Sequence, residues 1–175
     1  MLESLTQSAA AVTLVDAKAH MRVTYADDNT LITSQILMAQ QLVESQTRLT
    51  LSSAQWQVTT QDREIALEWG DLATVDEVAT IAKDGTATAI TDFTQPNYNG
   101  ARYVYIGDAT EGPTFRVKYT TQANADKIQL LKQAVLMTVG HFYENREQIV
   151  MGAKPEEMPL GAVHIMRHLS IGRYA

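Results

Sequence analysis

Hydrophobic and polar positions divide the chain into three consecutive zones. In the first zone, residues 12–51, apolar residues recur with the period of a helix. Thr13 is placed to cap a short helix that ends near Arg22. The zone therefore begins with a short helix.

A long second helix is expected over residues 25–49, with Asp27 or Asp28 accepting the free N–H groups of its first turn. Two neighbouring stripes give this helix a wide apolar face. The first stripe contains Leu31, Gln35, Met38, Leu42 and Leu49, and the second contains Ile32, Ile36, Ala39 and Val43. Such a face predicts burial against other helices.

The middle zone, residues 54–121, changes to short runs rich in Val, Ile, Thr, Tyr and Trp. These runs are "WQVTT", "EIALEW", "TVDEVATIA", "TATAITDF", "ARYVYI" and "TFRVKYT". Asp84-Gly85 predicts a tight two-residue hairpin turn, because such a turn needs positive φ angles. In the last run, apolar Phe115, Val117 and Tyr119 alternate with basic residues, which indicates one buried and one wet face. The zone predicts a small antiparallel β unit.

The third zone returns to the helical period after Thr121. One long helix is expected from about Asn124, its N-cap, to a point just before Gly152. Its apolar face contains Ile128, Leu131, Val135, Leu136, Val139, Phe142 and Ile149. A loop then leads to a short last helix, "LGAVHIMRHLSIG".

This order predicts an α+β fold. We expect the helices of residues 12–53 and 122–175 to form one helical bundle, with residues 54–121 inserted as an antiparallel sandwich or open barrel. Two independent domains in series would give the same periodicity.

Composition limits the functions that are open to the chain. With 45% hydrophobic and 19% charged residues among 175, it has the profile of an ordinary globular protein. Cysteine is absent, which excludes disulfides and thiolate metal sites. No signal peptide or membrane span is expected. The net charge of −6 argues against broad binding to a phosphate backbone.

The charge is unevenly distributed along the chain. Residues 1–112 contain 6 basic and 15 acidic residues (−9), whereas residues 113–175 contain 8 basic and 5 acidic residues (+3). Such polarity favours stacking of subunits on one another or on an acidic partner.

The densest group of chemically active side chains is "HFYENRE", residues 141–147. His141, Glu144 and Glu147 lie three residues apart, a spacing with which one helix face can bind a metal. A di-metal bundle needs matching carboxylates on partner helices, and the second helix offers only Glu44. Ring packing with solvated or paired charges is therefore the favoured interpretation.

Other candidate motifs are incomplete. His164 and His168 stand four residues apart but lack the glutamate of a zinc protease. No serine elbow, nucleophilic cysteine or phosphate loop occurs in the sequence. Trp56 and Trp69, on expected strands, favour core or subunit contacts over ligand stacking. The sequence thus predicts no catalytic residue, no cofactor and no bound metal.

Taken together, several segments resemble one protein family. "VTLVDAKAHMRV" (12–23), followed by "DDNTLITSQILMAQQLVE" (27–44), resembles the opening of tailed-bacteriophage head–tail connector (adaptor) proteins. The closing part is similar too: an apolar helix running into "HFYENRE", then "PLG" and a short final helix. The β-rich insertion that ends in "FRVKYT" is similar to that of connectors found in prophages. One departure is "TTQANADK" (120–127), where family members often have Gly and Pro.

The resemblance implies a non-enzymatic structural protein of the virion neck, assembled in the bacterial cytoplasm. It would form a closed ring of about twelve subunits beneath the portal protein. The ring would extend the DNA channel without sequence-specific binding and support a downstream stopper or tail-terminator protein.

Five residues are candidates for interaction with these partners. We hypothesise that Arg167, Arg173 and Tyr174 of the last helix and tail dock into a portal groove. Tyr143 and Arg146 are expected to contact a neighbouring element, in the same subunit or across subunits. The alternatives are another neck protein such as a completion or terminator protein, a ligand-binding β module using Trp56 and Trp69, and a helical metalloprotein.

Overall fold

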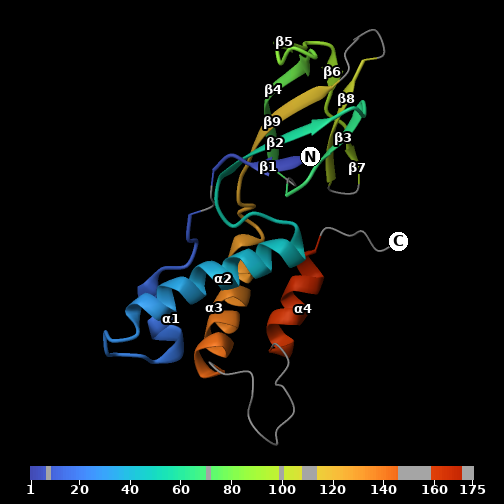
Figure 1. Ribbon diagram of the computed structural model, residues 1–175. Coiled ribbons are helices and arrows are strands. Elements are labelled where there is room, and N and C mark those ends of the chain that lie inside the picture. The colour runs from blue at the N-terminus through green and yellow to red at the C-terminus, as the bar shows by residue number, and fades with distance from the viewer. Residues whose placement is uncertain (7–8, 70–71, 99–100, 108–113, 146–158, 171–175) are drawn as a thin grey trace, which may run out of the picture. The chain divides into compact units, whose positions relative to one another are not determined.

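The computed structural model describes residues 1–6, 9–69, 72–98, 101–107, 114–145 and 159–170. The chain divides into two compact units, one of residues 1–9 and 48–124 and the other of residues 10–47 and 125–175. The first unit contains strands and the second contains helices (Figure 1). The predicted α+β class is therefore confirmed.

The helical unit contains four described helices. They are α1 (Leu14–Met21), α2 (Asn29–Thr47), α3 (Ile128–Glu144) and α4 (Leu160–Leu169). None of the helices in the described part of the chain is long and apolar enough to cross a membrane. Helix α3 contacts each of the other three helices and so forms the centre of the unit.

Helix α1 begins and ends where the sequence predicts. The backbone N–H of Asp16 donates to Thr13 Oγ1 at 3.1 Å, and the Asp16 carboxylate accepts from the N–H of Thr13, so the two residues form a capping box. At the other end, Arg22 adopts a left-handed φ of 58° and donates its N–H to the last turn.

The core of the helical unit is formed where α2 packs on α3. Ile32, Ile36, Ala39 and Val43 of α2 are buried, as are Leu131, Val135 and Val139 of α3. Burial of such side chains stabilises a fold by about 1.5–3 kcal/mol each, before the cost of ordering the chain. One of the two predicted stripes of α2 is therefore the core stripe.

The other predicted stripe is only partly buried. Gln35 and Leu49 are buried, whereas Met38 is 56% exposed. Leu31 and Leu42 are half-buried. The wide apolar face of α2 is thus buried along one stripe and only partly covered along the other. An uncovered strip of apolar surface remains within the helical unit.

Helix α3 is shorter than predicted. It begins at Ile128, and Lys127 at the N-cap makes no side-chain cap bond. It ends at Glu144, because the backbone of Asn145 leaves the helical region with φ −110° and ψ 63°. The backbone N–H and the side-chain amide of Asn145 both donate to His141 O and so satisfy a carbonyl of the last turn. The expected end at Gly152 lies outside the described residues.

The β unit consists of two antiparallel sheets. One has the strand order β1 (Leu2–Ser4), β2 (Ala54–Thr60), β9 (Phe115–Thr121), β4 (Ala73–Ile81) and β5 (Ala87–Ala89). The other has the order β3 (Glu64–Leu67), β8 (Ala101–Ile106) and β6 (Phe93–Thr94), and β7 (Asn97–Tyr98) also pairs with β8. Strand β1 was not predicted, since three residues carry no periodic signal.

The two sheets share one hydrophobic core, which makes the unit a sandwich. Phe115, Val117 and Tyr119 alternate inward along β9, as predicted, and pack with Val104 and Ile106 from the other sheet. The outward side chains of β9, Arg116 and Lys118, bind Glu77 of β4 at 2.6 and 2.7 Å and lower its pKa through their hydrogen bonds.

The predicted hairpin turn at Asp84-Gly85 is present in a wider form. Positive φ is confined to Gly85, at 87°, whereas a two-residue turn of the expected type needs two such residues. The N–H of Gly85 donates to Ala82 O, and Asp84 Oδ1 accepts from the N–H of Thr86 at 2.9 Å. The side chain of Asp84 thus stabilises the turn.

Replacing Ile36 by Ala is expected to lower the free energy of unfolding of the helical unit by about 2–5 kcal/mol, because it leaves a cavity against α3. The matched change Met38→Ala removes an exposed side chain and should cost no more than about 0.5 kcal/mol. Urea unfolding followed by far-UV circular dichroism reports on the helices, while tryptophan fluorescence reports on the β unit. Equal losses for both variants would contradict the observed packing.

Candidate interaction surfaces

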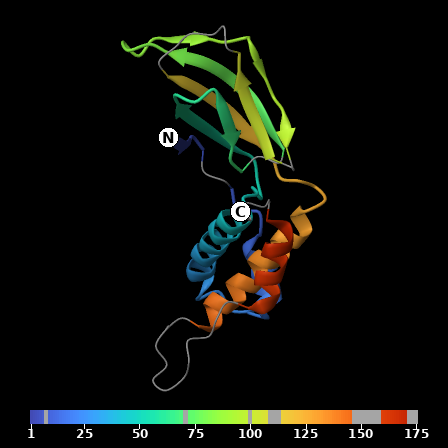
Figure 2. The same cartoon turned by 90° about the vertical axis from the view of Figure 1, so that its right-hand side faces the viewer.

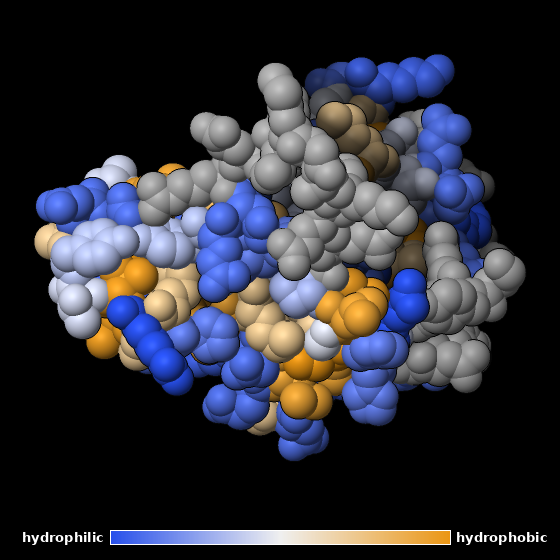
Figure 3. Space-filling model, turned by 90° about the horizontal axis from the view of Figure 1, so that it is seen from below, coloured by the Kyte–Doolittle hydropathy of each residue, from blue (hydrophilic) through white to orange (hydrophobic). Residues whose placement is uncertain are grey.

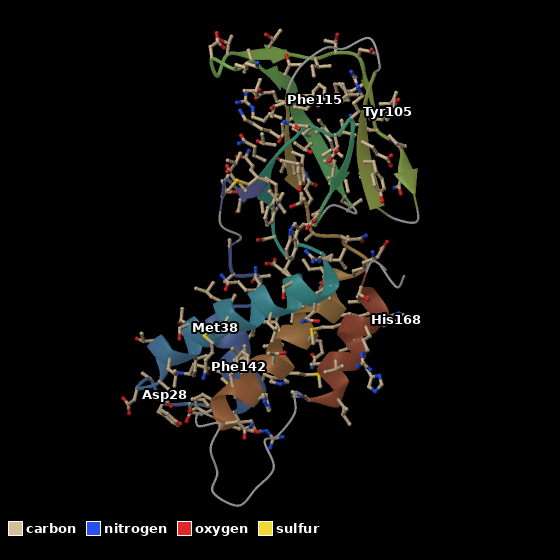
Figure 4. All side chains as sticks on the ribbon, turned by 45° about the vertical axis from the view of Figure 1, so that its right-hand side comes forward. Asp28, Met38, Tyr105, Phe115, Phe142 and His168 are labelled. Atoms are coloured by element: carbon tan, nitrogen blue, oxygen red, sulfur yellow. The ribbon has the colours of Figure 1, made fainter. Side chains whose placement is uncertain are left out.

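The C-terminal end of α3 is tied to the loop before α2. The hydroxyl of Tyr143 donates to Asp28 Oδ2 at 2.7 Å and hydrogen-bonds to the hydroxyl of Tyr25. Asp28 and Phe142 lie at the same end of the helical unit (Figure 4). The Gln35 amide donates to Phe142 O at 3.1 Å, which adds a second link between α2 and α3.

Helix α1 holds this loop in place. The ammonium of Lys18 donates to Tyr25 O and to Asn29 Oδ1 at 2.8 Å. The left-handed Arg22 redirects the chain directly after α1. Tyr25 is 50% exposed, but its backbone carbonyl accepts from Lys18 and its hydroxyl is hydrogen-bonded to Tyr143. These two contacts fix its position.

These contacts give Tyr143 a structural role, which is to hold the end of α3 against the loop before α2. Its hydrogen bonds with Tyr25 and Asp28 raise its pKa, because a phenolate next to the Asp28 carboxylate would be repelled. Tyr143 contacts an element of its own subunit, the loop before α2. Arg146, Arg173 and Tyr174, the other candidates on this end and on the tail, lie outside the described residues.

The remaining side chains of "HFYENRE" do not converge. His141 Nδ1 lies 3.2 Å from the amide nitrogen of Asn145, and Glu144 is exposed. Glu147 lies outside the described residues. Within the described part of the chain, no group of three or more His, Asp or Glu side chains is arranged to hold a metal ion.

Helix α4 presents a basic outer face. Its Ala162, Met166 and Leu169 are buried, whereas His164, Arg167 and His168 are exposed. His168 lies on the outer side of the helix (Figure 4). Arg167, the one predicted portal contact within the described residues, therefore points to solvent and is available to an acidic partner.

The two tryptophans of the β unit stack on each other. Their ring centroids are 5.4 Å apart with planes 2° apart, and the Arg48 guanidinium lies 5.4 Å from the centroid of Trp69. Arg48 also bridges to Glu68 at 3.1 Å, and the Trp56 indole N–H donates to Thr121. Each ring is thus the stacking partner of the other, and within the described residues the buried indole N–H of Trp69 has no hydrogen-bond acceptor.

Exposed apolar side chains occur on all four helices of the helical unit. They are Val15 of α1, Leu37 and Met38 of α2, Leu130 of α3 and Leu160 of α4. Seen from below, the molecule shows apolar areas separated by polar side chains (Figure 3). A sequence pattern did not identify these residues as exposed, because the same helical period describes buried and partly buried stripes.

Tyr143→Phe is expected to lower the stability of the helical unit, because it removes the hydrogen bond to Asp28. Since the pKa of Tyr143 is raised on folding, its contribution is complete below the ordinary value of 10.0 and is lost as the pH rises above it. Wild-type stability should therefore fall in alkali more steeply than that of the variant. Urea midpoints by circular dichroism at several alkaline pH values test this.

Tyr119→Phe supplies the matched control in the β unit. Burial raises the pKa of Tyr119, and its hydroxyl donates to Glu68 O at 2.9 Å. This variant should change the unfolding reported by tryptophan fluorescence and leave the helical signal alone. If Tyr143→Phe left the urea midpoint of the helical unit unchanged at every pH, the hydrogen bond from Tyr143 to Asp28 would make no contribution to stability.

Comparison with known proteins places these features in a family context. Residues 11–83 match the family described as phage gp6-like head-tail connector protein. No curated protein matches the sequence. The matched region contains α1, α2 and the strands from β2 to β4.

Two solved structures share the fold over the whole chain. One is a chain in the neck of an empty GTA particle computed with C6 symmetry, with a TM-score of 0.77 and 18% identity. The other is a chain in the neck of a native GTA particle computed with C12 symmetry, with a TM-score of 0.71 and 16% identity. Each match covers 100% of this chain and 97% of the other. The resemblance that the sequence indicates is thus confirmed: residues 11–83 match the head–tail connector family, and the whole chain shares its fold with chains in these two necks.

Proposed function

We propose that the chain is a head–tail connector (adaptor) protein. Copies of it form a ring beneath the portal of a tailed phage or phage-like particle, and the ring extends the DNA channel. The observation that carries the proposal is the family match over residues 11–83, which includes α1 and α2. The fold likeness to a neck chain computed with C12 symmetry supports a ring of twelve copies.

The charge of the chain suits a channel through which DNA slides. Its formal net charge is −6, and a protein that grips phosphates would present a basic stripe. The role is non-enzymatic, in keeping with the architectural position of Tyr143 and with the separate contacts of His141 and Glu144. The ring contacts the portal on one side, and on its other side it offers a platform to a stopper or tail-terminator protein.

Static light scattering and negative-stain images of the purified chain, alone and mixed with portal protein from the same particle, test the proposal. Rings of about twelve-fold symmetry, free or seated on the portal, are expected. A chain that stays monomeric and ignores the portal would contradict it. Binding instead to the end of a tail tube would favour a tail-terminator role.

Portal attachment is proposed to use the basic face of α4 and the tail after it. A deletion of residues 158–175 would remove this proposed contact, but it would also remove the buried Ala162, Met166 and Leu169 and so damage the helical unit. A truncation after Ser170 removes Arg173 and Tyr174 and keeps α4. The substitution Arg167→Glu reverses one exposed charge without touching the core.

Truncation after Ser170 and Arg167→Glu should each weaken co-sedimentation with portal particles while leaving the circular dichroism spectrum and unfolding midpoint unchanged. The expected loss from the charge reversal is about ten-fold in affinity, which corresponds to about 1.4 kcal/mol. Lys83→Glu, at the exposed hairpin of the β unit, is the matched control for loss of a basic charge. Unaltered sedimentation of both α4-side variants would place the portal contact elsewhere.

A further inference from the structure

The outer side of α2 carries no charge. It is formed by Thr30, Thr33, Ser34, Leu37, Met38, Gln41 and Ser45, all exposed, and is called the α2 outer face. The one charged residue of the helix, Glu44, is buried and accepts a hydrogen bond from Gln40. A helix face that stays in water usually carries charged residues. An uncharged face with exposed Leu37 and Met38 is instead typical of a surface that a partner covers.

A second uncharged surface lies on α3. Gln129, Gln133, Leu136 and Gly140 follow one another at helical spacing and form the α3 outer ridge. Gln129 and Gln133 are exposed, and Leu136 and Gly140 are half-buried. The one charged residue of α3 before Glu144 is Lys132. The pKa of Asp16 in α1 is lowered mainly by its hydrogen bonds with Thr13 and, to a smaller extent, by the positive charge of Lys132, which places Lys132 on the side of α3 that faces α1.

The two surfaces lie on opposite sides of the helical unit. Helix α2 packs on α3 through Ile36 and Val43, and α3 packs on α2 through Leu131 and Val135. Each outer surface therefore points away from the other helix. Figure 2 shows α2 on one side of this unit and α3 with α4 on the other. A ring of identical copies needs two different, complementary surfaces placed in this way.

Gly140 supplies an independent observation. Glycine within a helix destabilises it by comparison with alanine. A Cβ at this position would have His20 Cδ2 as its nearest neighbour, at 3.9 Å, which is an ordinary contact distance. The described part of the subunit therefore has room for alanine at Gly140. A small residue on an outer helix surface allows the backbone of another helix to approach closely.

We infer that the α2 outer face of one copy packs against the α3 outer ridge of the next copy, with Gly140 at the point of closest approach. The inference rests on the proposed ring and assigns its subunit contact to the helical unit. Leu37 and Met38 bury their apolar surface against Leu136 and Gly140. The serine, threonine and glutamine side chains of both surfaces supply hydrogen bonds across the contact.

Cross-linking tests the pairing of the two surfaces directly, because the chain has no cysteine of its own. Ser34→Cys marks the α2 outer face and Gln133→Cys marks the α3 outer ridge. With a short bis-maleimide, the double variant should give a ladder of covalent multimers. A mixture of the two single variants should give dimers only, and each single variant alone should stay monomeric.

The other outcomes overturn the inference in distinguishable ways. Dimers from a single variant alone would indicate a two-fold contact between identical faces. Rings seen by negative stain without any cross-link would show that the ring forms through another surface. If neither rings nor cross-links form, with or without portal protein, the proposed ring itself fails, and this contact fails with it.

Gly140→Ala separates a role in assembly from a role in folding. The variant should raise the unfolding midpoint of the helical unit, because alanine favours the helix. It should also raise the protein concentration needed for half-assembly about ten-fold, because the added Cβ blocks close approach. Unchanged or easier assembly of Gly140→Ala would overturn the inference.

Gly161→Ala is the matched control in α4. There an added Cβ would lie 2.5 Å from Met137 Cε, so its effect falls on packing inside the subunit. The concentration for half-assembly should stay within about two-fold of the wild-type value. Equal assembly defects in both glycine variants would mean that subunit packing, and not the proposed contact, controls assembly.

Discussion

The packing of α2 on α3 is the contact on which the helical unit depends. These helices are separated in sequence by residues 48–124, which contain every strand of the β unit except β1, yet they bury each other's apolar residues. Helices α1 and α4 each pack on both α2 and α3. The tie from Tyr143 to Asp28 and the bond from Gln35 to Phe142 fix the end of α3 against the start of α2. The long insertion between α2 and α3 is tolerated because the entropic cost of closing a loop grows only slowly with its length. The packing of α2 on α3 offsets that cost.

This dependence also explains which parts of the structure follow from the sequence. The cap at Thr13 and the alternation along β9 are local patterns, and the structure confirms both. The core stripe of α2 was recognised, but the periodicity did not show that Met38 would be exposed. Exposure depends on how far a partner helix reaches, which is a property of the tertiary structure.

The contacts of the candidate interaction residues could not be predicted from the sequence for the same reason. The sequence singled out Tyr143 but not its partner Asp28, which is 115 residues away. It placed Trp56 and Trp69 on strands, which is wrong for Trp69, because that residue lies in the turn after β3 with a left-handed φ of 65°. Only the fold brings the two rings into a stack. Strand β1 has no periodicity of its own and forms because β2 offers it an open edge. In each case the missing information is a long-range contact, which no local pattern encodes.

The inserted arrangement has a consequence for how the chain folds during synthesis. Every strand of the β unit, from β1 to β9, precedes α3, so all the strands of the sandwich are synthesised before residue 128. Until α3 emerges, the apolar side of α2 with Ile32, Ile36 and Val43 has the short helix α1 as its one packing partner and stays largely open to solvent or to chaperones. The helical unit, whose first two helices precede most of the β unit in the chain, is therefore completed only after that unit.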